Sequence, residues 1–102
     1  MEKPKKLEER CVMASKVFKT LSHPLRLKIL CNLFDGEKAV GELEELCQGS
    51  QSLVSQCLKR LELEGYVGAR REGENVYYSI TDERLVELFK SFEQVFCCIK
   101  KK

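Results

Sequence analysis

Residues 40–61 read VGELEELCQGSQSLVSQCLKRL, and this stretch decides the fold. Its spacing predicts a short helix over residues 40–47, a tight connection through residues 48–50, and a second helix over about residues 51–64. Ser50 stands where a side-chain oxygen can cap the second helix. Two helices joined by so short a turn are typical of the helix-turn-helix motif.

The second helix of this motif has one apolar face and one polar face. The apolar face is predicted at Leu53, Val54, Cys57, Leu58 and Leu61. The polar face has side chains at positions i, i+3, i+4 and i+7, namely Ser52, Ser55, Gln56 and Lys59. With Ser50 and Gln51 at the helix start, these side chains can contact base edges and phosphates, and Gln56 is the best candidate for reading a base. The alternative for each residue alone is a solvated helix surface.

The residues after Gly65 alternate in polarity, which predicts a β-hairpin over residues 66–80 with its tip at residues 73–75. Arg70, Arg71 and, at the tip, Asn75 are placed to contact phosphates or the minor groove beside the helix. The alternative is an exposed hairpin without a ligand. A helix-turn-helix followed by a basic wing favours double-stranded DNA as the partner.

Helices are also predicted on both sides of this motif. The first has an apolar line at Leu7, Cys11, Ala14, Phe18 and Leu21. The second begins after Ser22-His23-Pro24, which we expect to supply its cap and its first residue; it is apolar enough for the centre of the core and ends at Gly36. The last, which Thr81 is expected to cap, has an apolar stripe at Leu85, Leu88, Phe89, Phe92, Val95 and Phe96. The chain is thus predicted to be mainly α with a small β-hairpin.

The apolar surfaces of the first and last helices exceed what so small a core needs. We therefore expect a homodimer with two-fold symmetry through these two helices. The alternative is that both helices close the core of a monomer. A dimer would place its recognition helices about 34 Å apart, which matches an inverted-repeat operator.

With 102 residues, the chain is long enough for one core of a few helices and too short to enclose a catalytic cleft as well. We expect a single domain over residues 1–102, flexible ends at residues 1–6 and 99–102, no enzymatic activity and no cofactor. The 18 Lys and Arg nearly balance 16 Asp and Glu, so a cationic surface must arise by local segregation. No apolar run approaches the roughly 20 residues of a membrane span, and no signal sequence follows Met1. These features predict a cytoplasmic protein with no membrane partner.

Four segments resemble successive signatures of the ArsR/SmtB family of bacterial repressors. They are residues 21–30 (LSHPLRLKIL), 40–43 (VGEL), 50–58 (SQSLVSQCL) and 70–78 (RREGENVYY). The resemblance implies a winged helix-turn-helix repressor of five helices plus a wing that releases its operator in response to an inducer.

The better-known members of that family respond to metal ions, but their ligands are missing from this sequence. Their thiolate pair in the third helix would fall at Ala39 and Gly41. Their zinc site in the last helix needs histidines, whereas His23 is the only histidine of this chain. We therefore expect neither type of metal site.

Cys31 and Cys97 resemble the cysteine pair of the dithiol, persulfide-sensing branch of the family, the SqrR/BigR/HlyU type. The resemblance implies that reactive sulfur species are the inducer and link the two thiols through sulfur, which lowers operator affinity. Such chemistry requires a thiolate that attacks a sulfane sulfur and a second thiol close enough to resolve the product.

Other interpretations of these thiols stay open. Cys31 can be a small apolar core residue, whereas Cys97 lies off the centre of the apolar stripe of the last helix. Cys97 and Cys98, with Cys11 or another thiol of a partner chain, form an alternative site for arsenite or another thiophilic metal.

The remaining cysteines are predicted to have other roles. Cys11 and Cys57 are expected to serve packing, Cys98 is an auxiliary thiol or a surface residue, and the role of Cys47 is undecided. A thiol enzyme is disfavoured, because the chain has no Cys-x-x-Cys motif and no Gly-rich cofactor loop.

Overall fold

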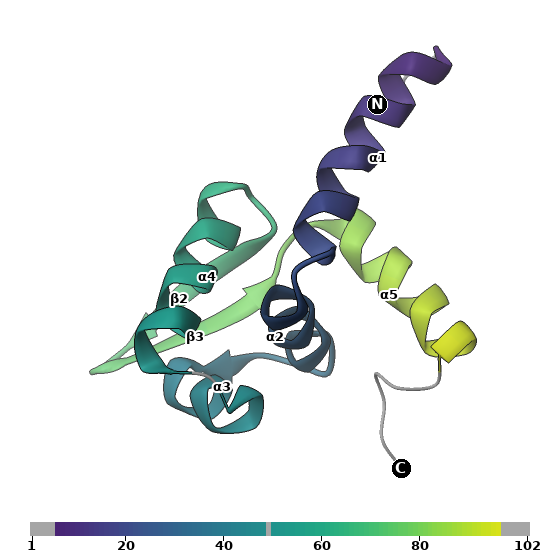
Figure 1. Ribbon diagram of the computed structural model, residues 1–102. Helices are drawn as coiled ribbons and strands as arrows, with labels where there is room; N and C mark the ends of the chain where they lie inside the picture. Colours follow the sequence, from purple (N-terminus) through teal and green to yellow (C-terminus); the bar gives the residue numbers. More distant parts are fainter. Residues whose placement is uncertain (1–5, 49, 97–102) are drawn as a thin grey trace.

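The computed structural model describes residues 6–48 and 50–96, and its elements follow the predicted order (Figure 1). They are α1 (Leu7–Leu21), α2 (Pro24–Phe34), β1 (Lys38–Ala39), α3 (Val40–Cys47), α4 (Gln51–Leu63), β2 (Val67–Glu72), β3 (Asn75–Ile80) and α5 (Glu83–Phe96). This is the predicted winged helix-turn-helix. The ends for which we expect flexibility, residues 1–6 and 99–102, lie outside the described residues except for Lys6.

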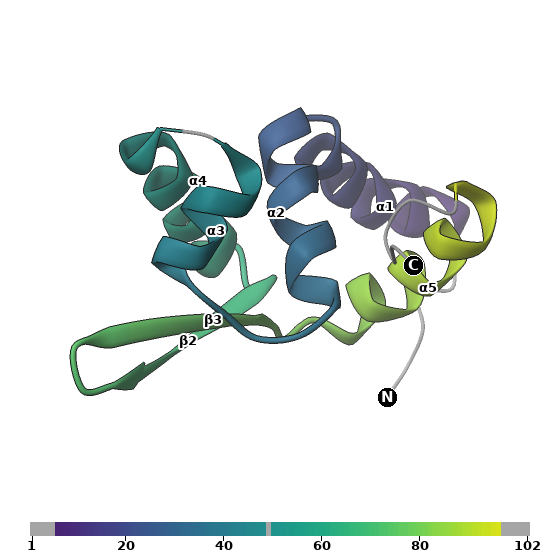
Figure 2. The ribbon, with the colours of Figure 1, turned by 90° about the horizontal axis from the view of Figure 1, so that it is seen from below.

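Helix α2 forms the centre of the core, as its composition predicts. Ile29, Leu30 and Leu33 of α2 are buried. They belong to one cluster with residues of α3, α4, the wing and α5, including Leu43, Val54, Leu58, Leu61, Tyr66 and Phe89. Figure 2 shows α2 between the α3–α4 pair on one side and α1 with α5 on the other. One core therefore connects the helix-turn-helix with α5 and with the C-terminal part of α1.

The wing belongs to a sheet of three antiparallel strands in the order β1-β3-β2. The two-residue strand β1 was not predicted, because so short a segment has no alternation to detect. In the hairpin, Glu72 pairs with Asn75, so the turn is Gly73-Glu74. Gly73 has a φ of 64°, which suits glycine in a two-residue hairpin turn. Asn75 is therefore the first residue of β3, and its predicted place within the tip is wrong.

Two predicted helix caps are also wrong. His23 is the N-cap residue of α2 but forms no side-chain cap, and the Ser22 hydroxyl instead donates to the carbonyl of Lys19 at 2.8 Å. At the start of α5 the cap is Asp82 rather than Thr81, since Asp82 Oδ1 accepts the backbone N–H of Arg84 at 2.8 Å. At each of these helix starts, two adjacent residues have a side chain that can accept a hydrogen bond. The sequence does not show which of the two occupies the N-cap position.

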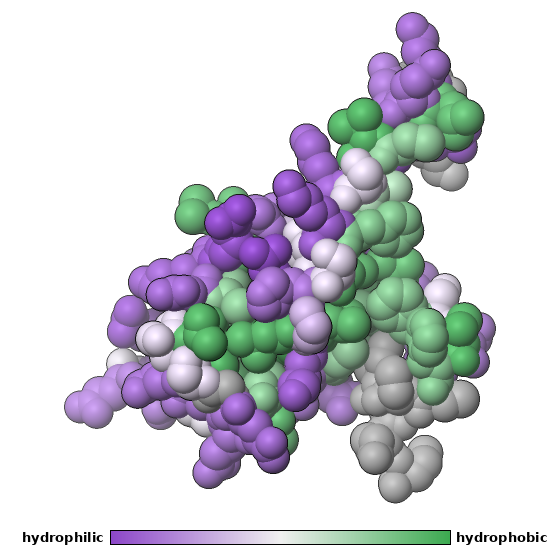
Figure 3. Space-filling model, in the orientation of Figure 1, coloured by the Kyte–Doolittle hydropathy of each residue, from purple (hydrophilic) through white to green (hydrophobic). Residues whose placement is uncertain are grey.

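Helix α1 contacts the core only through its C-terminal part. Thr20 and Leu21 are its buried residues. Most of its predicted apolar line is exposed, namely Leu7, Cys11, Ala14 and Phe18. The last two described residues of α5, Val95 and Phe96, are exposed as well. Figure 3 shows a continuous apolar surface that runs from α1 onto α5. Within one chain, α1 does not close the core.

Candidate nucleic-acid interface and thiol groups

The turn between α3 and α4 fixes how the polar face of α4 is presented. Gln48 ends α3 in the left-handed region with a φ of 52°. The Ser50 hydroxyl then accepts the backbone N–H of Leu53 at 3.2 Å, which is the predicted cap of α4. Helix α4 starts immediately after this sharp turn, with Gln51 and Ser52 exposed in its first turn.

The burial of one face of α4 determines which residues its other face offers. Val54, Leu58 and Leu61 are buried against the core. Ser52, Gln56 and Lys59 are exposed, and Ser55 is half-buried. Leu53 was predicted on the apolar face, but its exposed fraction is 52% because it lies at the edge of that face. The polar face predicted from the sequence is thus available to a ligand.

A hollow of about 350 Å³ separates α4 from the wing. Ser55, Lys59 and Glu62 of α4 line one side, and Arg71 of β2 and Tyr78 of β3 line the other. Arg71 lies opposite Val76 in the hairpin, and both residues share the face that looks towards α4. Two cations, Lys59 and Arg71, and one carboxylate, Glu62, therefore line a concave surface next to the exposed ridge of α4.

Arg70 lies on the opposite face of the wing, because successive side chains of a strand alternate. Its guanidinium bonds both carboxylate oxygens of Glu37, at 2.9 and 2.8 Å, and Glu72 Oε1 at 2.7 Å. It also lies 4.8 Å from the centre of the Tyr77 ring. The Arg70 guanidinium lowers the pKa of Glu37, and the two carboxylates raise the pKa of Arg70. Arg70 thus connects the wing to the segment after α2. The sequence analysis predicts the same DNA contact for Arg70 and Arg71 and does not distinguish the two residues.

The described thiols occupy distinct environments. Cys31 is half-buried on α2, Cys57 is half-buried on α4, and both pack against the core. Cys47 is buried at the end of α3, and burial raises the pKa of its thiol. Cys11 is exposed on α1 within one chain, so the packing predicted for it requires a partner that covers this face of α1. Cys97 and Cys98 lie outside the described residues.

A row of aromatic rings connects α2 with the end of α5. The centre of the Phe34 ring lies 5.9 Å from that of Phe89, Phe89 lies 5.4 Å from Phe92, and Phe92 lies 5.8 Å from Phe96. Cys31 precedes Phe34 by one helical turn. The part of α2 that carries Cys31 is therefore packed against the helix whose described end directly precedes Cys97 in the sequence.

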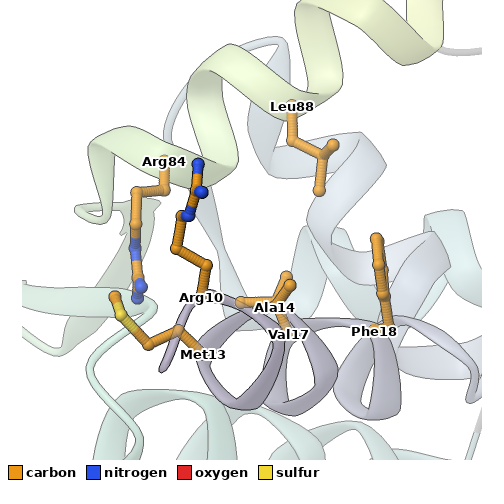
Figure 4. A pocket seen from close by; sticks show the side chains of 7 residues that line it. All are labelled: Arg10, Met13, Ala14, Val17, Phe18, Arg84 and Leu88. Carbon is orange, nitrogen blue, oxygen red and sulfur yellow. The ribbon is translucent and has the colours of Figure 1, made fainter. Parts of the chain in front are cut away.

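An apolar groove of about 310 Å³ lies between α1 and α5 (Figure 4). Its lining residues are Arg10, Met13, Ala14, Val17 and Phe18 of α1, and Arg84 and Leu88 of α5. Figure 4 shows Phe18 and Leu88 facing the space between the two helices. The groove is continuous with the exposed apolar surface of α1.

Two further properties apply to the described residues alone. Among residues 6–48 and 50–96, no three side chains of His, Cys, Asp or Glu are grouped to hold a metal ion. In the same part of the chain, no helix has both the length and the apolar character that a membrane crossing requires.

The sequence and the structure resemble known regulators over nearly the whole chain. Residues 23–68 match the family described as "Bacterial regulatory protein, arsR family". A biofilm growth-associated repressor of Xylella fastidiosa is 36% identical over 95 residues, with 93% of this chain and 83% of the relative covered. The transcriptional activator HlyU of Vibrio cholerae is 32% identical, with 89% of this chain and 84% of HlyU covered.

Solved structures agree with this relationship. The transcriptional repressor BigR from Xylella fastidiosa superimposes with a TM-score of 0.83 at 36% identity, over 90% of this chain and 94% of BigR. A homodimeric winged helix-turn-helix DNA-binding domain from Mycobacterium bovis has a TM-score of 0.73 at 30% identity, over 92% of this chain and 89% of that domain. This chain therefore belongs to the ArsR family of bacterial transcriptional regulators.

Proposed function

We propose that this regulator is a homodimeric repressor that binds an inverted-repeat operator and releases it when reactive sulfur species link Cys31 to Cys97. The observation that carries the DNA-binding part is the exposed polar ridge of α4, held by the Ser50 cap beside a hollow with Lys59 and Arg71. A helix of this kind fits the major groove, while the wing reaches the flanking backbone.

Each candidate residue has a role in this proposal. Gln56 reads a base edge, with Ser52 and Ser55 beside it. The start of α4 and the wing contact the backbone through Ser50, Gln51, Lys59, Arg71 and Asn75. For Arg70, which the sequence predicts to contact DNA, this proposal assigns a structural role instead, because its bonds to Glu37 and Glu72 support the wing.

The dimer is supported by the apolar surface that one chain leaves exposed. The exposed fractions of Leu7, Phe18 and Phe96 are 66%, 59% and 64%. Burial of such side chains is worth about 1.5–3 kcal/mol each, which favours a second copy of the chain as their partner. The homodimeric Mycobacterium bovis domain has the same fold. Two-fold symmetry would place two α4 helices about 34 Å apart, one turn of DNA.

Reactive sulfur species are proposed as the inducer because they can link the thiols of Cys31 and Cys97. A Cys31 or Cys97 thiolate attacks the sulfane sulfur of an organic persulfide, the S–S bond breaks, and a thiol leaves. Two cysteine persulfides formed in this way condense to a trisulfide and release hydrogen sulfide, so that no other oxidant is consumed. With a single persulfide, the second cysteine displaces hydrogen sulfide and a disulfide remains. Either link joins the end of α5 to α2.

The link is proposed to change the relative position of the two recognition helices. Helix α2 packs against α4, and α5 packs against α2 through the row of aromatic rings. A shift of α5 would therefore move residues of the dimer surface and, through α2, change the position of α4. A coupling free energy of about 1–3 kcal/mol would lower operator affinity roughly 5- to 150-fold.

DNA binding by matched variants tests the roles of the three polar residues. Gln56→Ala is expected to cost about 1–3 kcal/mol on the preferred duplex and to relax the preference at one base pair. Arg71→Ala is expected to weaken all duplexes alike and to reduce the slope of log affinity against log salt, because a phosphate contact is lost. Arg70→Ala is expected to change that slope less than Arg71→Ala does. Fluorescence anisotropy at several salt concentrations measures all three effects.

The opposite pattern would refute these assignments. If Arg70→Ala reduces the salt dependence while Arg71→Ala leaves it unchanged, the phosphate contact is made by the face of the wing that carries Arg70 and not by the face towards α4. If Gln56→Ala weakens preferred and random duplexes equally, Gln56 does not read a base.

A further inference from the structure

A second hollow, of about 300 Å³, lies on the side of α4 away from the wing. His23 and Arg26 line it from the start of α2, and Gln56 and Arg60 line it from α4. No carboxylate is among its described lining residues. The hollow thus presents two guanidinium groups and an imidazole beside the same glutamine that is the candidate for reading a base.

Arg60 is held in a defined orientation at the edge of this hollow. Its Nε donates to Glu64 Oε2 at 3.0 Å, and the other oxygen of Glu64 accepts the Thr20 hydroxyl at 3.3 Å. Thr20 is only 5% exposed, so the end of α1 fixes the carboxylate. The exposed fraction of the Arg60 side chain is 60%, and within the described part of the chain its terminal nitrogens donate no hydrogen bond. Both terminal nitrogens therefore remain available to an anion.

The two hollows lie on opposite flanks of one helix. Ser55 and Lys59 line the wing hollow, whereas Gln56 and Arg60 line the second hollow. An α-helix with its side chains is about 10–12 Å wide, close to the roughly 12 Å width of the major groove. A helix seated there has a phosphate backbone on each side. Cations lie on both of these flanks of α4, Lys59 and Arg71 on the wing side and Arg26 and Arg60 on the other side.

We infer that the hollow between α2 and α4 is a second backbone-binding site, in which Arg26 and Arg60 contact the DNA strand opposite the one contacted by Lys59 and Arg71. The inference rests on the proposed function and adds residues that the sequence analysis did not select. Glu64 acts here as a positioning residue, because it directs Arg60 without contacting DNA. The wing and the start of α2 would then hold α4 from both sides and fix its orientation in the groove.

Salt dependence of binding tests this inference. The probes are a 30-base-pair duplex selected by the protein from a random pool and a random duplex of equal length. Arg60→Gln is expected to reduce the slope of log affinity against log salt by about one to two units, because one contact contributes about 0.9 and a dimer carries the hollow twice. Affinity should fall about fivefold or more at 0.1 M salt on both duplexes. Arg60→Lys should restore most of the slope.

Two controls separate this effect from a general loss of charge or of folding. Lys16→Gln removes the same charge from α1, away from α4, and should leave the slope unchanged. Glu64→Gln removes a negative charge near DNA, and this loss of charge alone would tighten DNA binding. If Glu64 positions Arg60, the same substitution is expected to weaken DNA binding instead. Thermal unfolding of each variant should remain close to that of the parent protein.

The outcomes distinguish the inference from the proposed function. If the parent protein binds DNA with salt dependence and Arg60→Gln leaves the slope unchanged, the second backbone site is refuted and the proposed function stands. Tighter binding by Glu64→Gln would refute the positioning role. If the parent protein binds neither duplex, the proposed function fails, and the inference fails with it.

Methylphosphonate substitution of single phosphates locates the contacted strand. Within one half-site, neutral phosphates on one strand should weaken the parent protein but not Arg60→Gln, and those on the other strand should weaken the parent protein but not Arg71→Gln. Loss of sensitivity on the same strand of that half-site in both variants would contradict the assignment of opposite strands.

Discussion

Replacing Phe89 with alanine is expected to lower the free energy of unfolding by about 3–5 kcal/mol, a large part of the roughly 5–15 kcal/mol available to a domain of this kind. Phe89 is fully buried, and its ring contacts those of Phe34 and Phe92. The substitution leaves a cavity where α5 meets α2. Urea unfolding followed by circular dichroism measures the effect.

A graded pair of variants makes this test specific. Phe89→Leu keeps most of the buried volume and should cost much less than Phe89→Ala. Leu63→Ala removes a side chain whose exposed fraction is 85%, and it should change stability by less than about 0.5 kcal/mol. Equal unfolding midpoints for Phe89→Ala and the parent protein would show that α5 does not pack on α2 as described.

Replacing either Cys31 or Cys97 with serine is expected to abolish the release of DNA by persulfide while leaving binding of the reduced protein intact. The parent protein should lose roughly 5- to 150-fold in operator affinity after treatment with an organic persulfide, and each variant should lose little. Serine is nearly the same size as cysteine but does not form the sulfur link. Fluorescence anisotropy gives the affinity, and peptide-resolved mass spectrometry gives the bond formed.

Other thiols of the chain provide the controls. Cys11→Ser and Cys57→Ser should release DNA like the parent protein, because neither residue belongs to the proposed pair. Normal release by both Cys31→Ser and Cys97→Ser would exclude this pair as the sensor. Release by arsenite alone, with unmodified thiols in persulfide, would favour the alternative site at Cys97, Cys98 and Cys11.

Much of the fold could be predicted because its signals are local. The period of apolar residues predicted the helices, and the tight connection closed by Ser50 predicted how α4 begins. Alternation predicted the hairpin. The two strands of the wing and the buried face of α4 follow from residues within one element, so a single sequence carries the information.

The parts that were missed depend on residues distant in sequence. Glu37 precedes Arg70 by 33 positions, and no local pattern shows that the two are paired. Strand β1 exists because β3 offers it a partner. Likewise, the sequence alone suggests that Arg60 is an ordinary solvated residue. The structure shows that Thr20 and Glu64 hold it in the hollow that Arg26 also lines. Alternation does place Arg70 and Arg71 on opposite faces, but only the fold shows which face looks towards α4.

Selection of DNA from a random duplex pool by the parent protein tests the central claim, that two α4 helices related by two-fold symmetry read DNA together. The proposed dimer predicts enrichment of an inverted repeat whose half-site centres lie about 10–11 base pairs apart. Gln56→Ala should reduce the base preference at one symmetric pair of positions in the selected sequence. Failure to enrich any sequence, or enrichment of a single site without symmetry, would contradict it.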